Sequence, residues 1–243
     1  MPMADDRRPP TEAPASQTLS RGIRILEILA DAREPLTIDE VARLMGVHRS
    51  IAYRLVRTLE GHALVSRDSA GRLALGARMA ALAAGVAPDL QSEALPELTA
   101  VANELGMTCF LAILDRDECI TLASVEPRHA VASVAQRPGA RHPITVGAPS
   151  KAILSALPPR DWPVVAVGDA LRDEIAEAAI RGYATSHDEV IPTVQAVSVP
   201  LRLRGGSRPA AIAVVHVGGA PASADIAARL HRSAAAIREA LEG

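Results

Sequence analysis

The side chains best suited to contact another macromolecule form one cluster in the first quarter of the chain. Arg49, Tyr53 and Arg57 recur at steps of four residues, so they share one face of a helix. Ser50 and Arg54 lie beside them. A guanidinium group can pair bidentately with phosphate, or with O6 and N7 of guanine. Because an isolated stripe of charge is more often only a solvated helix face, its meaning depends on the elements around it.

The segments around this cluster predict a helix-turn-helix. Apolar residues at three- and four-residue steps predict a helix over 18–32. Thr37, followed three residues later by Glu40, predicts a capping box that opens a short second helix. Gly46 ends that helix and begins a three-residue turn, after which a third helix over about 49–61 carries the cluster. Two helices joined by a short turn with glycine form the helix-turn-helix pattern.

A β-hairpin is predicted directly after these helices. Alternating apolar and polar residues predict strands over 63–67 and 72–75, joined by a short turn with glycine. Three helices and a hairpin together predict a winged helix-turn-helix domain over 18–76. Arg67 and Arg72 lie on the predicted wing, where they could reach phosphates or an adjacent minor groove.

This domain context changes the interpretation of the basic cluster, which we expect to bind duplex DNA. The second helix of the motif is the element that enters the major groove. The amide groups that follow Thr37 would point toward a phosphate at the start of the preceding helix. The predicted DNA-binding residues are Thr37, Arg49, Ser50, Tyr53, Arg54, Arg57, Arg67 and Arg72.

The distribution of charge agrees with this prediction. The formal net charge is -2, but residues 48–85 hold six arginines against Glu60 and Asp68. Residues 86–243 hold fourteen basic against eighteen acidic side chains. One short basic stretch therefore lies in an acidic chain. With one tryptophan, two tyrosines and one phenylalanine, the chain has few of the aromatic platforms that single-stranded nucleic acids stack on.

Length and composition exclude several classes of protein. A chain of 243 residues, 49% of them apolar, can bury one large core or two ordinary ones. No apolar run approaches the ~18 residues that span a bilayer, so we expect no membrane insertion. Residues 1–17 hold four prolines and no apolar run, so they are predicted to be a disordered arm and not a secretory signal. Two cysteines, without a disulfide framework, fit a cytoplasmic protein.

The rest of the chain predicts a linker helix over 77–88 and a second domain over 89–243. Runs of strands with helices at both ends indicate an α+β domain on a mainly antiparallel sheet. The predicted helices cover 77–86, 93–105, 150–157, 171–181 and 223–241, and the predicted strands cover 107–114, 119–125, 130–135, 194–201 and 210–217.

Other clusters give weaker signals of chemistry. His187-Asp188-Glu189 could hold a metal or exchange protons, but consecutive residues point in different directions, so a polar loop is favoured. Cys109 and Cys119 could face each other across a hairpin, although buried reduced cysteines usually act as small apolar residues. The chain has no G-x-S-x-G, S-x-x-K or glycine-rich phosphate loop. We therefore predict no catalytic residue, no metal ligand and no cofactor, and not an enzyme.

From residue 17 to the end, the order and spacing of several segments resemble the isocitrate lyase regulator (IclR) family of bacterial transcription factors. This resemblance implies a GAF-like effector-binding domain after the winged helix-turn-helix and linker helix. It also implies a homodimer or a dimer of dimers (a homotetramer), a pseudo-palindromic operator, and repression or activation, of which we favour repression. The matching segments are Leu19-Ser20-Arg21-Gly22, Ile25-Leu26-Glu27, residues 49–55, 71–76, 151–154 and 181–184, Glu189 and Val197-Ser198-Val199-Pro200.

The resemblance also implies an effector pocket, and this chain departs from the family there. The loop before the family's lysine, here Lys151, usually offers backbone N–H groups to an anion, but Pro149 has none to donate. Ser186 stands where some members have an acidic residue, and Ala196 where cysteine is common. His142 stands where members with small 2-oxo-acid effectors have an apolar residue. The effector-binding positions carried over are Val131, Val134, His142, Ala148, Pro149, Ser150, Ser186 and Ala196.

These departures predict a larger and less charged small-molecule effector, such as an aromatic catabolite oriented by His142. A lone histidine near a sheet is also compatible with a purely structural role. The alternative function is an enzyme-like sensor of a metabolite or metal, whose N-terminal helices contact protein and whose metal ligands would be Cys109, Cys119 and a histidine.

Overall fold

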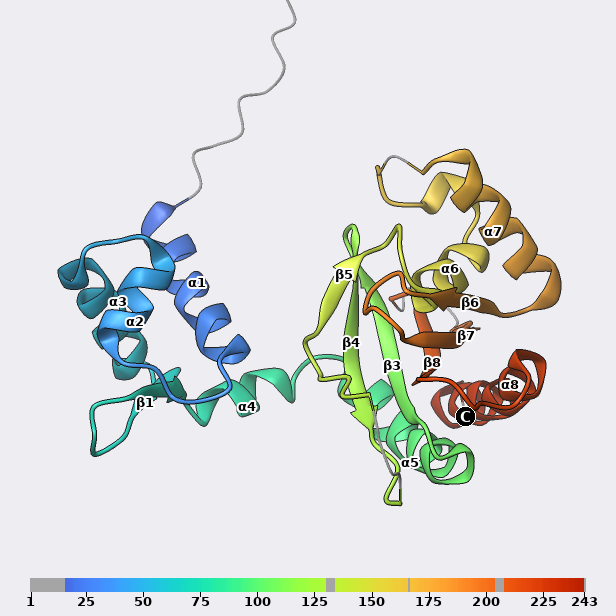
Figure 1. Ribbon diagram of the computed structural model, residues 1–243, viewed down its shortest axis with the longest axis horizontal. Coiled ribbons are helices and arrows are strands. Elements are labelled where there is room, and N and C mark those ends of the chain that lie inside the picture. Colours follow the sequence, from blue (N-terminus) through green and yellow to red (C-terminus); the bar gives the residue numbers. More distant parts are fainter. Residues whose placement is uncertain (1–15, 130–133, 166, 204–207, 243) are drawn as a thin grey trace, which may run out of the picture. The chain divides into compact units, whose positions relative to one another are not determined.

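The computed structural model describes residues 16–129, 134–165, 167–203 and 208–242. The chain divides into two compact units, one ending at Val86 and the other beginning at Ala87. Each unit has its own apolar core. Figure 1 shows the elements of both units in sequence colours.

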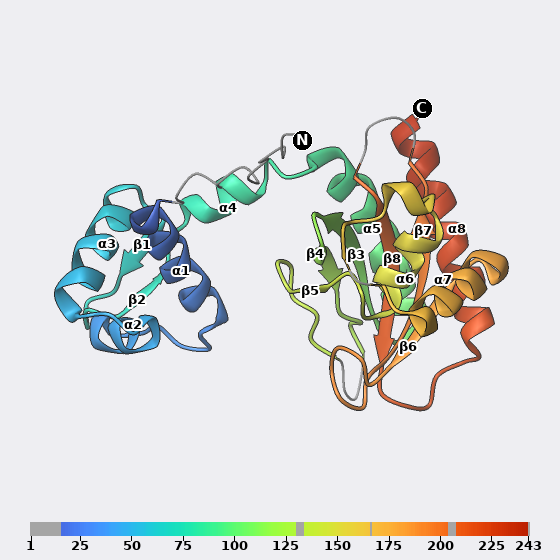
Figure 2. The same cartoon turned by 90° about the horizontal axis from the view of Figure 1, so that it is seen from above.

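The first unit is a winged helix-turn-helix (Figure 2). Ile25, Val41 and Val56, one from each of the first three helices, are completely buried together with Leu73 of the hairpin. The two strands of that hairpin pair antiparallel. The elements of this unit are α1 (Gln17–Asp31), α2 (Ile38–Met45), α3 (Arg49–Gly61), β1 (Val65–Arg67), β2 (Leu73–Leu75) and α4 (Arg78–Ala83).

Two glycines fix how the helices of the first unit connect. Gly46 has φ of 64°, which is the left-handed conformation that glycine adopts without strain, and so it can end α2 in a tight turn. Gly76 follows the hairpin and faces the chain just after α3. A Cβ atom at Gly76 would lie 2.1 Å from the carbonyl oxygen of Ala63, so only glycine fits there.

The second unit is a six-stranded antiparallel sheet between two layers of helices (Figure 1). The strand order is β5-β4-β3-β8-β7-β6. One core, rich in residues of α5 and α8, covers one face of the sheet, and a second core, with residues of α6 and α7, covers the other. The elements are α5 (Pro88–Leu105), β3 (Thr108–Asp115), β4 (Glu118–Val125), β5 (Arg141–Pro143), α6 (Ala148–Ser155), a short 3-10 helix (Pro159–Asp161), α7 (Asp169–Arg181), β6 (Ala184–His187), β7 (Gln195–Leu201), β8 (Ala210–His216) and α8 (Ser223–Glu242).

The predicted α+β fold class is confirmed, with differences in individual elements. The helix α5 begins at Pro88 and not at residue 93, because proline is well tolerated in the first turn of a helix. The predicted strand over 130–135 is wrong where it can be compared, since Val134 and Ala135 are not in a strand, and 130–133 fall outside the described residues. The strand that pairs with β4 at that edge of the sheet is instead β5, Arg141–Pro143.

The expectation that Cys109 and Cys119 could face each other is also wrong. Cys109 pairs in register with Val125, and Cys119 pairs with Leu114. The two thiols belong to different cores, on opposite faces of the sheet. Burial raises the pKa of Cys119 to about 12 and raises that of Cys109 as well, so both stay protonated.

Metal sites and membrane-spanning helices are both absent from the described residues. Within the described ranges, no group of three or more His, Cys, Asp or Glu side chains is arranged to hold a metal ion. No helix in these ranges is long and apolar enough to cross a membrane.

Candidate nucleic-acid interface and ligand cavity

The outward face of α3 carries the five clustered residues that the sequence singled out. Ala52 and Val56 bury the opposite face of this helix completely. Tyr53 is 49% exposed. The guanidinium-bearing side of α3 is thus turned away from the core of its own unit. The exposed side chains of this face are Arg49, Ser50, Tyr53, Arg54 and Arg57.

Few of these side chains are engaged by carboxylates of the protein. Arg49 Nε lies 3.3 Å from Asp39 Oδ1, but both side chains are 64% exposed, and a pair this exposed contributes at most about 1 kcal/mol. Among the described residues, Arg54 and Arg57 take part in no ion pair. Their guanidinium groups are therefore available to a partner.

His48, immediately before α3, is a residue that sequence reasoning missed. Its Nδ1 accepts a hydrogen bond from the N–H of Ser50 at 3.3 Å and lies 2.9 Å from the Ser50 hydroxyl. Since Nδ1 accepts, a neutral His48 ring carries its proton on Nε2, which can donate to a phosphate or a base edge. The capping position of His48 was the signal that could have found it.

The residues expected at the start of α2 are engaged within the protein. Thr37 Oγ1 accepts from the N–H of Glu40 at 3.3 Å, and Glu40 Oε2 accepts from the N–H of Thr37 at 2.7 Å. The backbone hydrogen bond from Thr37 is the largest of the interactions that lower the pKa of Glu40. The N–H groups of Thr37 and Glu40 are thus both engaged within the capping box.

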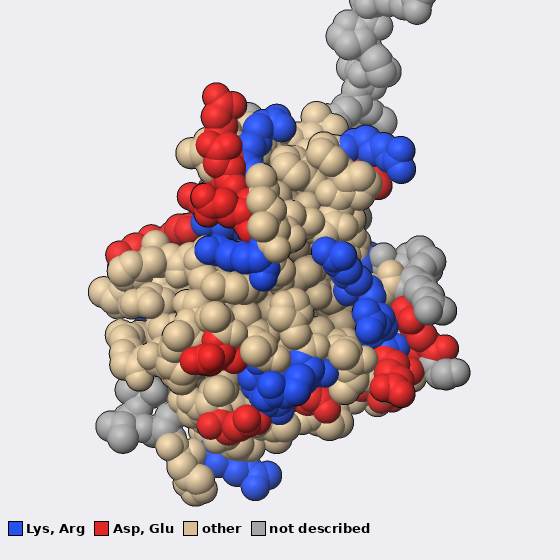
Figure 3. Space-filling view, turned by 90° about the vertical axis from the view of Figure 1, so that its right-hand side faces the viewer, with Lys and Arg blue, Asp and Glu red and all other residues tan. Residues whose placement is uncertain are grey.

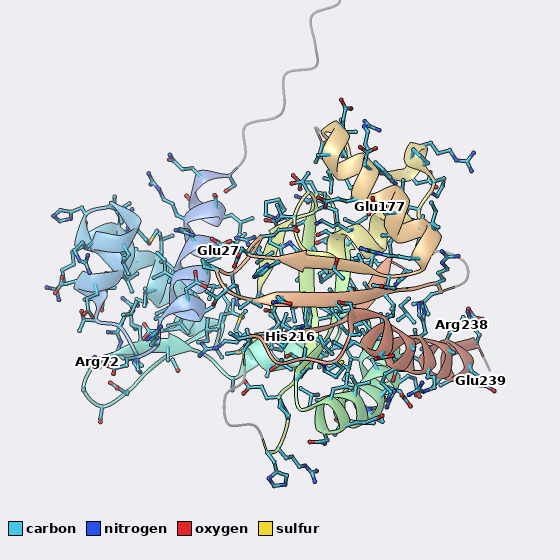
Figure 4. All side chains as sticks on the ribbon, turned by 45° about the vertical axis from the view of Figure 1, so that its right-hand side comes forward. Glu27, Arg72, Glu177, His216, Arg238 and Glu239 are labelled. Carbon is cyan, nitrogen blue, oxygen red and sulfur yellow. The ribbon has the colours of Figure 1, made fainter. Side chains whose placement is uncertain are left out.

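The two arginines of the wing differ in how many of their donors remain available. Arg67 donates to both carboxylate oxygens of Glu60 and to the carbonyl of Gly71. Arg72 lies on the hairpin (Figure 4), and among the described residues its guanidinium group donates one hydrogen bond, to the carbonyl of Pro35 at 3.0 Å. Arg72 therefore keeps more donors for a partner than Arg67 does.

The second unit offers a different surface and a small internal cavity. On the side of α7 and α8, acidic and basic side chains are interspersed (Figure 3). A cavity of about 30 Å³ lies between the sheet, the start of α6 and the loop after β6. It is lined by Phe110, Gln136, His142, Gly147, Pro149, Ser186, Val190, Ile191, Val194, Ala196 and Val215.

Four of the eight predicted effector positions line this cavity, namely His142, Pro149, Ser186 and Ala196. The three other positions that the structure describes do not line it. Ala148 and Ser150 are buried in α6, and Val134 packs against the core on the α6 side. Val131 lies outside the described residues. The sequence did not indicate the other residues of the cavity, because none of them carries a local motif. They are Phe110, Gln136, Gly147, Val215 and the apolar side chains of the loop after β6.

The first amides of α6 are occupied by side chains of the protein. The N–H of Gly147 donates to Glu189 Oε2 at 2.8 Å, and the N–H of Ala148 donates to Ser186 Oγ at 3.0 Å. Pro149, in the first turn, has no N–H. Lys151 Nζ contacts Glu189 Oε1 at 2.5 Å and also contacts Glu174. Glu189, which sequence reasoning placed in a polar loop, thus joins that loop to α6.

His142 presents one defined nitrogen to the cavity. Desolvation by burial is the main cause that lowers the pKa of His142, so its ring is neutral near pH 7. Nδ1 lies 3.1 Å from the carbonyl oxygen of Pro143. A carbonyl can only accept, so Nδ1 carries the proton and Nε2 is left with a lone pair. Nε2 and Cε1 lie beside Gly147 at the start of α6.

Comparison with known proteins places both units in one family. Residues 18–69 match the model of the IclR helix-turn-helix domain, and residues 83–238 match that of the bacterial transcriptional regulator IclR C-terminal domain. The HTH-type transcriptional regulator Rv1719 of Mycobacterium tuberculosis is 31% identical over 206 residues, which cover 79% of each chain.

Two solved structures of IclR-family proteins also match this chain. An IclR regulator from Alicyclobacillus acidocaldarius matches with a TM-score of 0.77 and 26% identity, covering 93% of this chain and 98% of that one. An IclR homologue from Microbacterium hydrocarbonoxydans, solved in complex with 4-hydroxybenzoate, matches with a TM-score of 0.76 and 25% identity, covering 93% and 99%.

Proposed function

The chain belongs to the IclR family of bacterial transcriptional regulators, and from this premise we propose that it binds an operator in duplex DNA through α3 and releases it in response to a small molecule. The observation that carries the proposal is the outward face of α3, where Arg54 and Arg57 have no ion pair within the described part of the chain. A protein that leaves its operator when a ligand binds acts as a repressor. We further propose that it works in the cytoplasm and is not an enzyme.

We assign different tasks to the basic residues of the first unit. Arg54 and Arg57, with Tyr53, face the base edges of the major groove, while Arg49 and Ser50 position the start of α3. Arg72 holds the backbone from the wing. Arg67 acts through the hairpin, which it fastens to Glu60. His48 adds a donor at the start of α3.

The protein is proposed to act as a homodimer or a dimer of dimers on a pseudo-palindromic operator. Two copies of α3 must then enter major grooves about one turn, ~34 Å, apart. A ligand that binds one spacing of the two helices better than another shifts the population toward it and so changes operator affinity.

The proposed effector site is the cavity at the start of α6. Its lining is mainly apolar, with Gln136, His142 and Ser186 as polar side chains, and this composition suits an aromatic ligand. The complex of the Microbacterium hydrocarbonoxydans homologue with 4-hydroxybenzoate supports an aromatic effector. A cavity of about 30 Å³ is much smaller than a typical ligand site, so we infer that the lining, which includes Val190 and Ile191, moves apart when a ligand enters.

A mobility-shift experiment on the DNA that flanks the protein's own gene tests this function. We expect a discrete complex that survives an excess of unrelated duplex DNA. Failure to shift any segment of that DNA at low salt would instead favour N-terminal helices that contact protein.

A further inference from the structure

If this cavity is the ligand site, as the proposed function has it, then the charges around it restrict which ligands can bind. The start of a helix of eight residues would ordinarily attract an anion through its free amides. Here the N–H of Gly147 is taken by Glu189, the N–H of Ala148 is taken by Ser186, and Pro149 has none. A ligand carboxylate that binds the amide of Gly147 or Ala148 would have to displace Glu189 or Ser186.

The charge beside the cavity also disfavours an anion. Lys151 is 5% exposed and contacts two carboxylates, those of Glu174 and Glu189. One positive charge is therefore shared between two negative charges. No lysine or arginine is among the described residues that line the cavity. A carboxylate entering it would lose its hydration without gaining a cation.

Among the polar side chains that line the cavity, His142 offers a ligand an acceptor. His142 uses its Nδ1 proton on the Pro143 carbonyl, which leaves the lone pair of Nε2 next to the start of α6. This nitrogen can accept a hydrogen bond from a hydroxyl or N–H group. It would repel the oxygen of a carboxylate, which offers only lone pairs.

We propose that the cavity selects an uncharged ligand that carries a hydrogen-bond donor, and that Glu189 is the residue that determines this specificity by occupying the position of an anion. Apolar contact comes from Phe110, Val194 and Val215, and the ligand's hydroxyl or N–H group binds His142 Nε2. Rejection of carboxylates follows from the negative charge of Glu189 and from its hold on the Gly147 amide and on Lys151.

Two probes that differ mainly in charge test the proposal. 4-Hydroxybenzyl alcohol is neutral, and 4-hydroxybenzoate is an anion of nearly the same shape. Titration calorimetry on the full chain at pH 7.5 should give a dissociation constant at least about tenfold lower for the alcohol. Equal affinities, tighter binding of 4-hydroxybenzoate, or binding of neither compound would overturn the proposal.

Variants then test the role of Glu189. In Glu189→Ala, the Gly147 amide becomes available and Lys151 keeps Glu174 as its partner, so one negative charge beside the cavity is gone. The preference for the alcohol should therefore fall at least about fivefold through tighter binding of 4-hydroxybenzoate. Glu174→Ala is the matched control, because it removes the other partner of Lys151 without touching Gly147, and it should lower the preference much less than Glu189→Ala does. Glu189→Gln keeps the hydrogen-bond acceptor but not the charge, and it replaces Glu189→Ala in this comparison if Glu189→Ala does not fold. An unchanged preference in the Glu189 variants would overturn the assignment.

The same protein samples separate this proposal from the proposed function. The mobility shift is measured on each variant without ligand. A parent that shifts DNA but does not discriminate between the probes contradicts only the specificity proposal, whereas a parent that discriminates between the probes but shifts no DNA contradicts only the function.

Discussion

Arg67 of the wing and Glu60 of α3 form a two-point contact, with Nε 2.9 Å from Oε1 and Nη2 3.4 Å from Oε2. Both side chains are less than a third exposed. The contact ties the hairpin to the helix proposed to enter DNA, so that the two elements present a fixed geometry to a duplex.

Breaking this contact should weaken DNA binding more than it weakens the fold. We expect Glu60→Ala to lower the free energy of unfolding by only about 1 kcal/mol, because ion pairs near the surface contribute little. Operator affinity should fall several-fold, since the wing loses its anchor. Urea unfolding and fluorescence anisotropy measure the two effects, and unchanged affinity would contradict the role given to the contact.

Arg57 and Arg72 should respond differently to replacement by alanine. If Arg57 contacts a base, Arg57→Ala costs about 1–3 kcal/mol of specific binding and relaxes one operator position. Arg72→Ala should weaken all sequences alike and reduce the salt slope by about one phosphate contact. Salt titrations with operator and scrambled duplexes separate these patterns. If both variants bind as the parent does, the proposed interface is wrong.

Replacing Gly76 by a residue with a Cβ atom should destabilise the first unit, because the backbone of Ala63 occupies the space that this atom needs. In Gly76→Ala the new Cβ would lie 2.1 Å from the oxygen and 2.8 Å from the carbon of the Ala63 carbonyl, which is backbone and cannot rotate away. We expect the free energy of unfolding to fall by about 1–3 kcal/mol. The control is Gly61→Ala in α3, where nothing lies within 4 Å of the new atom. It should be neutral or gain up to about 1 kcal/mol from helix propensity.

Stability should fall at mildly acidic pH, partly because of His142. Burial lowers the pKa of its ring below the ordinary value of 6.5, so as pH falls through this value the unfolded chain binds a proton that the folded chain does not. The free energy of unfolding therefore decreases from about pH 7 down to the folded pKa. His142→Gln should make this loss shallower in urea unfolding at pH 7.5 and 5.5. Burial also lowers the pKa of His216, so replacing both should flatten the profile further.

The first unit could be predicted from sequence because its signals are local. The capping box of Thr37 and Glu40 spans three residues, and the left-handed turn at Gly46 needs only the glycine itself. Both were evident without any knowledge of distant contacts. Helix existence and order followed from such signals, and only a few helix ends moved.

The cavity could be predicted only in part because it joins distant segments. Gly147 and Glu189 are 42 positions apart, and their hydrogen bond leaves no local pattern in the sequence. The edge strand at Arg141–Pro143 is too short to show alternation. The family resemblance supplied His142, Pro149, Ser186 and Ala196, but not the way in which Glu189 changes their chemistry.

Lys151 is the one lysine of the chain, and its ammonium group is buried between two carboxylates. An acylating reagent that attacks amines therefore finds this single side-chain target, and it can react there only when the loop after β6 parts from α6. The rate at which residue 151 is acylated therefore reports how often that loop opens, in the free protein and with a candidate ligand bound.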